Sequence, residues 1–123
     1  MATSTINGGT QSPYIYRDTA LTNTAVTAYN GVSELRGWNI TNPNSSEVYV
    51  KFYDTTSTVT VGTTAIVKTL YIPANGTVYL EFRKDSAEIS FQSALKLACV
   101  TTLADSGSTA PSTAVYCEIF YTK

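Results

Sequence analysis

The chain contains no histidine among its 123 residues. Histidine is the usual general base near neutral pH and the commonest metal ligand, so its absence removes Ser-His and Cys-His nucleophile pairs. The sequence also lacks a phosphate-cradling glycine loop, a CxxC motif and a paired acidic motif. We therefore expect a protein that is not an enzyme, with no catalytic, cofactor-binding or metal-binding residues and no cofactor.

Charge is scarce as well. Charged residues make up 14% of the chain and the net charge is −1, whereas a typical globular protein is about 25% charged. The eight basic residues are spread along the sequence, which gives no footprint for nucleic acid. No apolar run approaches the roughly 20 residues of a membrane span. We expect neither nucleic acid nor a membrane as a partner.

The first residues, MATSTINGG, have neither the positive region nor the apolar region of a secretory signal. We therefore expect assembly in the cytoplasm of the cell that makes the protein, which either stays there or leaves by lysis or as part of a particle. Residues 1–13 are small, polar and glycine-rich, and they cannot supply a core. We interpret them as a flexible N-terminal arm, with a frayed terminus as the alternative.

Cysteine and tryptophan are rare. The only two cysteines, Cys99 and Cys117, share the inward parity of the last two predicted strands, so a disulfide is possible if these strands form a hairpin. Cytosolic assembly would keep both thiols reduced, and we favour two buried, neighbouring free thiols. The single tryptophan, Trp38, has the parity of Ile40, and we favour core packing over a sugar-stacking platform.

Threonine, serine, tyrosine and valine are abundant, with 21, 12, 9 and 10 residues respectively. β-Branched and aromatic residues favour strands, and serine favours turns. The clearest alternating segments are 47–54, 77–82, 94–102 and 114–121, and weaker ones are 21–29, 34–41, 66–72 and 87–91. No helical apolar stripe is present. Residues 14–123 are predicted to form one all-β domain, an antiparallel jelly-roll-like β-sandwich of about eight strands, with a barrel as second choice.

The alternation divides the strand residues into an inward and an outward set. The predicted core consists of Val48, Val50, Phe52, Leu70, Ile72, Val78, Leu80, Phe82, Leu97, Cys99, Val115, Cys117 and Ile119. The opposite parity contains Tyr49, Tyr53, Tyr71, Tyr79, Tyr116 and Phe120, with Lys51, Glu81 and Glu118 between them. Tyrosine suits protein interfaces. We interpret the six aromatics as interface candidates. The alternatives are that tyrosine is simply a good strand residue, or that both sheet faces are covered within the monomer.

Three stretches carry a resemblance to a known class of proteins. They are RGWNITNPNSSEVYVKFYD (36–54), VTVGTTAIVKTLYIPANGTVYLEF (59–82) and ISFQSALKLACVTT with GSTAP (89–102, 107–111). These stretches resemble small β-sandwich virion proteins of tailed bacteriophages, such as head decoration, cement or fibre-associated proteins. The resemblance covers about two-thirds of the chain. It implies a jelly-roll-like subunit, often a homotrimer, on a capsid shell or in a tail structure.

Two functions follow as expectations. The first is a capsid decoration or cement protein that binds itself and the phage major capsid protein and stabilises neighbouring capsid subunits in the virion. The alternative is a receptor- or glycan-binding module of a tail or head fibre, and a cellular carbohydrate-binding domain is a weaker third. Small size and the polar arm favour the first function. A glycan binder would also more often carry several aromatics on its loops.

Overall fold

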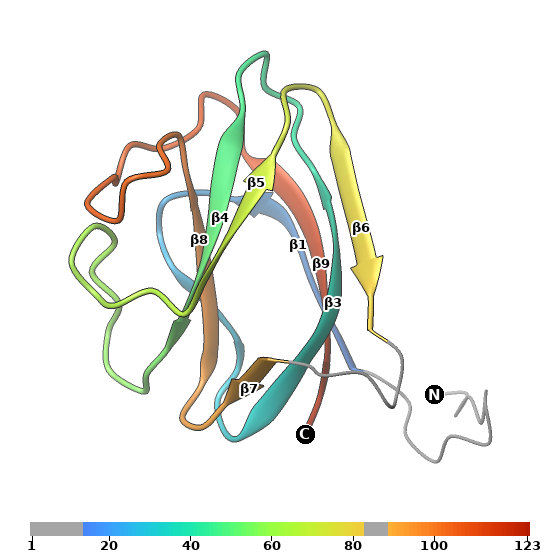
Figure 1. Cartoon of the computed structure of the whole chain (residues 1–123), viewed down its shortest axis with the longest axis vertical. Coiled ribbons are helices and arrows are strands. Elements are labelled where there is room, and N and C mark those ends of the chain that lie inside the picture. Colours follow the sequence, from blue (N-terminus) through green and yellow to red (C-terminus); the bar gives the residue numbers. More distant parts are fainter. Residues whose placement is uncertain (1–13, 83–88) are drawn as a thin grey trace.

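A computed structural model describes residues 14–82 and 89–123 of the chain, and within these residues it contains nine strands and no helix (Figure 1). The strands are β1 (Tyr14–Leu21), β2 (Val26–Tyr29), β3 (Ser33–Thr41), β4 (Val48–Asp54), β5 (Lys68–Ile72), β6 (Thr77–Glu81), β7 (Ile89–Phe91), β8 (Leu95–Val100) and β9 (Val115–Thr122). The all-β prediction is confirmed. The expected arm, residues 1–13, lies outside the described residues.

The strands form two antiparallel sheets that pack face to face. Sheet 1 has the order β1-β9-β3-β6, with the short β7 also paired to β3, and sheet 2 has the order β2-β8-β4-β5. The pairs β1 with β9, β2 with β8, β3 with β6 and β4 with β5 are nested along the chain. This nesting is the arrangement of a jelly roll, so the predicted architecture is confirmed.

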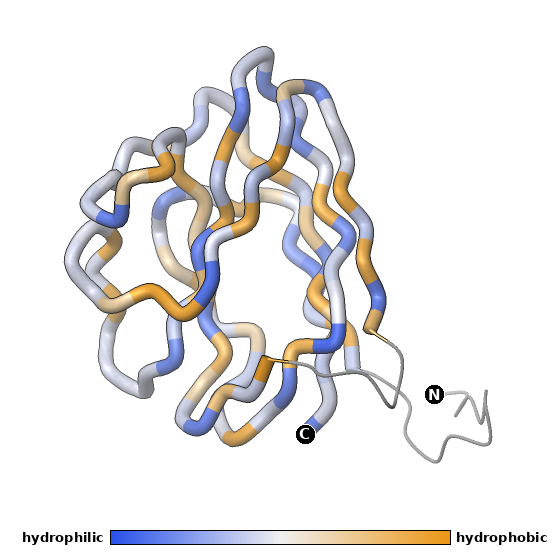
Figure 2. The backbone as a smooth tube through the Cα atoms, in the orientation of Figure 1, coloured by the Kyte–Doolittle hydropathy of each residue, from blue (hydrophilic) through white to orange (hydrophobic). Residues whose placement is uncertain are grey.

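The core lies between the two sheets and follows the period-two pattern of the strands. Along β6, at the right of the view, hydrophobic and hydrophilic residues alternate (Figure 2). In sheet 2, Val50 and Phe52 are fully buried, and in sheet 1 so is Ile119. Trp38 is only 6% exposed and packs edge-on against Phe82, with ring centroids 5.9 Å apart. The core interpretation of Trp38 is therefore confirmed.

One predicted core residue is exposed. Leu80 has the inward parity, because it pairs with Trp38 of β3, yet 38% of its surface is exposed. The reason is that β6 ends sheet 1, so no further strand covers its side. Its neighbours Val78 and Phe82 are half-buried against the core.

The first strand was not predicted, and the expected strand 21–29 contains only the shorter β2. Asp18 explains why β1 was not predicted. It lies opposite Cys117 at an inward position of β1, where the alternating strand pattern predicts an apolar residue. Its carboxylate accepts hydrogen bonds from the Tyr16 hydroxyl and the Ala20 backbone N–H, at 3.2 and 2.8 Å. These bonds satisfy a polar group where the register of β1 shifts.

The two cysteines lie on opposite sheets. Cys99 is on β8 of sheet 2 and Cys117 is on β9 of sheet 1, so β8 and β9 do not form a hairpin. Both side chains are buried and unbridged, as the free-thiol interpretation expects. Burial raises the pKa of each thiol to about 12, which keeps both sulfurs protonated near neutral pH.

Two buried asparagines tie one end of the sandwich together. The Asn42 side-chain amide donates to the carbonyls of Ser46 and Pro73, at 2.9 and 3.1 Å. Its oxygen accepts from the Asn44 backbone N–H at 2.9 Å, and the Asn44 side chain exchanges two hydrogen bonds with the Thr113 backbone. Three connections that are distant in sequence are thereby joined through side chains.

None of the described residues belongs to a helix that is long and apolar enough to cross a lipid bilayer.

Candidate interaction face

The outer surface of sheet 1 is a solvent-exposed face with aromatic and polar side chains, which we call the open face. Three rows cross it in the register of the strands. The rows are Ile15, Phe120, Gly37 and Glu81, then Arg17, Glu118, Asn39 and Tyr79, then Tyr116, Thr41 and Thr77. Ile15 and Tyr79 are each 59% exposed. Large apolar groups are therefore presented to solvent at both edges of the face.

A connected polar network holds the middle of the open face. The Tyr116 hydroxyl donates to Glu118 at 2.9 Å, and the Asn39 amide donates to the other oxygen of Glu118 at 3.2 Å. These two hydrogen bonds, with the positive charge of Arg17, lower the pKa of Glu118 below its usual value. Arg17 also lies over the Tyr116 ring, 5.4 Å from its centroid, and donates to its hydroxyl at 3.3 Å. The network fixes four long side chains in one arrangement.

A ring pair spans the face from β9 to β6. Phe120 and Tyr79 meet edge to face with centroids 6.1 Å apart, although β3 lies between their strands. Gly37, the β3 partner of Phe120, makes this contact possible because it places no side chain between the rings. A Cβ on Gly37 would come 2.2 Å from the Leu80 carbonyl oxygen, so no other residue fits there without a shift. The Tyr79 hydroxyl donates to Glu81 at 2.8 Å, which raises the Tyr79 pKa.

The outer surface of sheet 2 differs, and we call it the covered face. The connections 55–67 and 101–114 lie beside this sheet, at the left of the view (Figure 1). The Lys51 ammonium donates to the Ala104 carbonyl, and Lys96 donates to the Ser57 carbonyl at 2.8 Å. Lys51 and Tyr53 are fully buried as a result, although their parity points away from the core.

Burial has electrostatic consequences at the covered face. It lowers the pKa of Lys51, and nearby Asp105 opposes that shift. It also raises the pKa of Tyr53, whose hydroxyl has no hydrogen-bond partner among the described residues. A buried cation and an unpartnered hydroxyl both cost free energy, so the covering loops must contribute apolar packing that offsets this cost.

The six predicted interface aromatics do not form one surface. Tyr79, Tyr116 and Phe120 come together on the open face, whereas Tyr49 and Tyr71 form a separate pair on sheet 2 with centroids 5.7 Å apart. Tyr71 is 57% exposed. The expectation that Tyr53 faces solvent is wrong, because the loops cover it, and the same holds for Lys51.

Two members of the open face were missed by the sequence analysis. Ile15 and Arg17 belong to β1, which pairs with β9 along the edge of sheet 1. The alternation of Tyr14 and Tyr16 with these two residues was the available signal. It was too short to outweigh the polar residues that follow.

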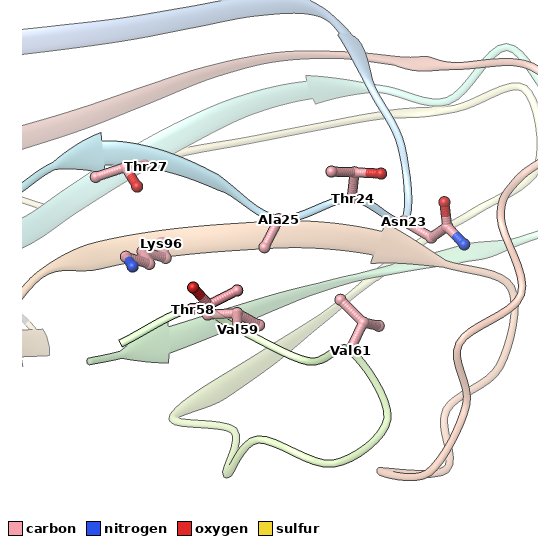
Figure 3. Close-up of a pocket in the computed structure, with 8 residues that line it drawn as sticks. All are labelled: Asn23, Thr24, Ala25, Thr27, Thr58, Val59, Val61 and Lys96. Atoms are coloured by element: carbon pink, nitrogen blue, oxygen red, sulfur yellow. The ribbon is translucent and has the colours of Figure 1, made fainter. Parts of the chain in front are cut away.

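A shallow groove of about 410 Å³ lies beside sheet 2 (Figure 3). Its lining residues come from the β1–β2 connection, β2, β8 and the 55–67 loop, and they are Asn23, Thr24, Ala25, Thr27, Thr58, Val59, Val61 and Lys96. None of these residues is aromatic. A sugar-binding groove normally offers a ring for stacking, so this groove does not favour glycan binding.

Within residues 14–82 and 89–123, no three histidine, cysteine, aspartate or glutamate side chains gather where they could hold a metal ion. The chain matches no protein-family model, and no curated protein is significantly similar to it.

Proposed function

We propose that this chain is a structural subunit of a phage virion, a decoration or cement protein that binds neighbouring capsid subunits through its open face. The observation that carries the proposal is an exposed sheet surface whose large side chains are already fixed by contacts within the protein. The resemblance of residues 36–54, 59–82 and 89–102 to small virion proteins supports the choice of partner, the phage major capsid protein.

The polar network makes the open face suitable for binding. Ordering a long side chain at an interface costs roughly 0.5–1.5 kcal/mol. Mutual hydrogen bonds hold Tyr116, Glu118, Asn39 and Arg17 before a partner binds. Binding therefore requires little further ordering of these side chains. Tyr79 and Ile15, each 59% exposed, supply apolar surface that a partner would bury.

The homotrimer remains part of the proposal and rests on the resemblance. A trimer would place three open faces around one axis, so that the subunit contacts several capsid proteins at once. Multivalent attachment of this kind raises the overall affinity without any new contact within a single face.

A capsid-binding assay tests the proposal. Purified capsids of the encoding phage, prepared without this protein, would be sedimented with the parent, with a Tyr79→Ser, Tyr116→Ser double variant, and with Tyr71→Ser as a matched control on sheet 2. We expect the double variant to lose at least about tenfold in affinity, while the control binds like the parent. The thermal midpoints of the variants, measured separately, report on folding.

Equal binding by the parent and a folded double variant would overturn the role of the open face. No binding by the parent would overturn the decoration function itself. Sedimentation velocity of the free protein addresses the trimer, and a monomer at all concentrations would refute that part.

A further inference from the structure

Three tyrosines from three strands stack at the end of the sandwich where the chain reaches Lys123. Tyr121 of β9 lies between Tyr14 of β1 and Tyr29 of β2, with ring centroids 5.6 and 5.5 Å apart and interplanar angles of 27° and 30°. The cluster joins the edge of sheet 1 to the edge of sheet 2. Tyr121 is 8% exposed and Tyr14 is 40% exposed, so the stack has a buried centre and an accessible rim.

A cation already lies on this stack. The Lys123 ammonium is 4.5 Å from the centroid of Tyr14 and 5.1 Å from the centroid of Tyr29. Both distances are within the roughly 6 Å at which a ring face attracts a cation. Two ring faces therefore converge on one positively charged position.

The surroundings leave room for a larger group. A hollow of about 170 Å³ adjoins Lys123, and its lining includes Glu34, Gln92 and Ser90. Lys123 is the residue that this hollow shares with the tyrosine stack.

We propose that Tyr14 and Tyr29 form a binding site for a quaternary ammonium group, and that Lys123 is its internal occupant, which a ligand must displace. Quaternary ammonium is favoured over a primary amine because it is weakly hydrated and gives up little solvation on a ring face. This site lies apart from the open face, so the proposal goes beyond the proposed function and does not depend on it.

Tetramethylammonium is the probe, and NMR of the Tyr14 and Tyr29 ring protons in the full chain is the readout. Removing the competing ammonium with Lys123→Ala should tighten binding about fivefold or more, because a self-occupied site binds in proportion to its free fraction. Lys68→Ala, which removes a lysine of β5 on sheet 2, is the control and should bind like the parent. A Tyr14→Leu, Lys123→Ala double variant should lose the gain, and its spectrum reports whether it is folded.

Two further measurements separate the possible outcomes. In the parent, the Lys123 ε-methylene protons should show upfield ring-current shifts that decrease in Tyr14→Leu, where only the Tyr29 ring remains. n-Butylammonium, which imitates a lysine side chain, should bind more weakly than tetramethylammonium to Lys123→Ala. The proposal is overturned if Lys123→Ala binds tetramethylammonium no more tightly than the parent, or if n-butylammonium binds better, which would make the site a lysine receptor.

Discussion

The open and covered faces belong to the same sandwich and have the same kind of sequence, yet they end in different environments. Tyr79 on the open face is 59% exposed, whereas Tyr53 on the covered face is fully buried. Each has the outward parity of its strand. The difference comes from the connections 55–67 and 101–114, which return over sheet 2 and not over sheet 1. Loops therefore decide whether an outward residue of this jelly roll is buried or exposed, and the strand pattern of the sequence does not describe those loops.

The largest expected effect contrasts the two tyrosines directly. Tyr53→Ala should lower the free energy of unfolding by roughly 3 kcal/mol, because it removes a fully buried ring and leaves a cavity. Tyr79→Ala should cost less than about 1 kcal/mol, since most of its ring already contacts solvent. Urea denaturation of both variants measures the difference. Similar losses for the two variants would mean that the loops do not cover Tyr53 in solution.

Tyr53→Phe is the control for that experiment. It keeps the ring and removes only a hydroxyl that has no hydrogen-bond partner among the described residues. We expect a change within about 0.5 kcal/mol of the parent, or a slight gain in stability.

Smaller losses of stability are expected when one carboxylate in each sheet is replaced, Asp54 in sheet 2 and Glu118 in sheet 1. Burial alone would raise the pKa of Asp54, but hydrogen bonds from the backbone N–H groups of Gln92, Ser93 and Ala94 outweigh it and lower the pKa. Asp54→Asn should cost about 1–2 kcal/mol at neutral pH. Glu118→Gln on the open face should cost less, about 0.5 kcal/mol, because a glutamine can keep the hydrogen bonds to Tyr116 and Asn39 and loses mainly the contact with Arg17, whose side chain is 60% exposed.

The pH dependence of the stability of Asp54→Asn gives a second check. A folded-state pKa below the unfolded value stabilises the protein above the unfolded pKa, and that stability is lost as the pH falls through the folded pKa. The difference between the parent and Asp54→Asn should therefore shrink below about pH 4. A difference that is constant from pH 7 to pH 2 would show that the charge of Asp54 does not matter.

The smallest expected effect concerns the buried cation of the covered face. Lys51→Met should be neutral or stabilising by up to about 1 kcal/mol at pH 7, because methionine fills a similar volume without the desolvation cost. The folded-state pKa of Lys51 is lowered, so the parent gains stability as the pH rises toward the unfolded value of 10.5. Chemical denaturation at pH 7 and pH 10 should show the advantage of the variant decreasing. A loss above about 2 kcal/mol at pH 7 would mean that the bond to Ala104 is a net stabilising contact.

The sequence predicted the inward set well because side-chain direction alternates strictly along a strand. Val50, Phe52 and Cys117 are all buried where the alternation places them. It did not predict the exposure of Leu80, since that depends on β6 being the edge of a sheet. Strand order is set by contacts between distant parts of the chain, and no local pattern contains it.

The same limit applies to the candidate sites. Tyr79 and Phe120 were predicted as outward aromatics, but their contact across β3 depends on the strand order of sheet 1 and on the glycine at position 37. Tyr14, Tyr29 and Tyr121 come from three strands of two sheets, and only the folded arrangement brings their rings together. Whether either surface binds a partner stays a prediction.

The buried asparagine pair bears on how the protein ages. An asparagine loses its amide when the backbone nitrogen of the next residue attacks the side chain, a step that needs a hydrogen on that nitrogen and access to it. Asn42 precedes Pro43, whose nitrogen carries no hydrogen, and it is fully buried. Asn75 is exposed, precedes Gly76 and has a positive φ of 53°. Asn30 is likewise exposed and precedes Gly31. We therefore expect stored protein to gain negative charge at exposed Asn-Gly pairs such as these, while the Asn42 amide that joins three connections stays intact.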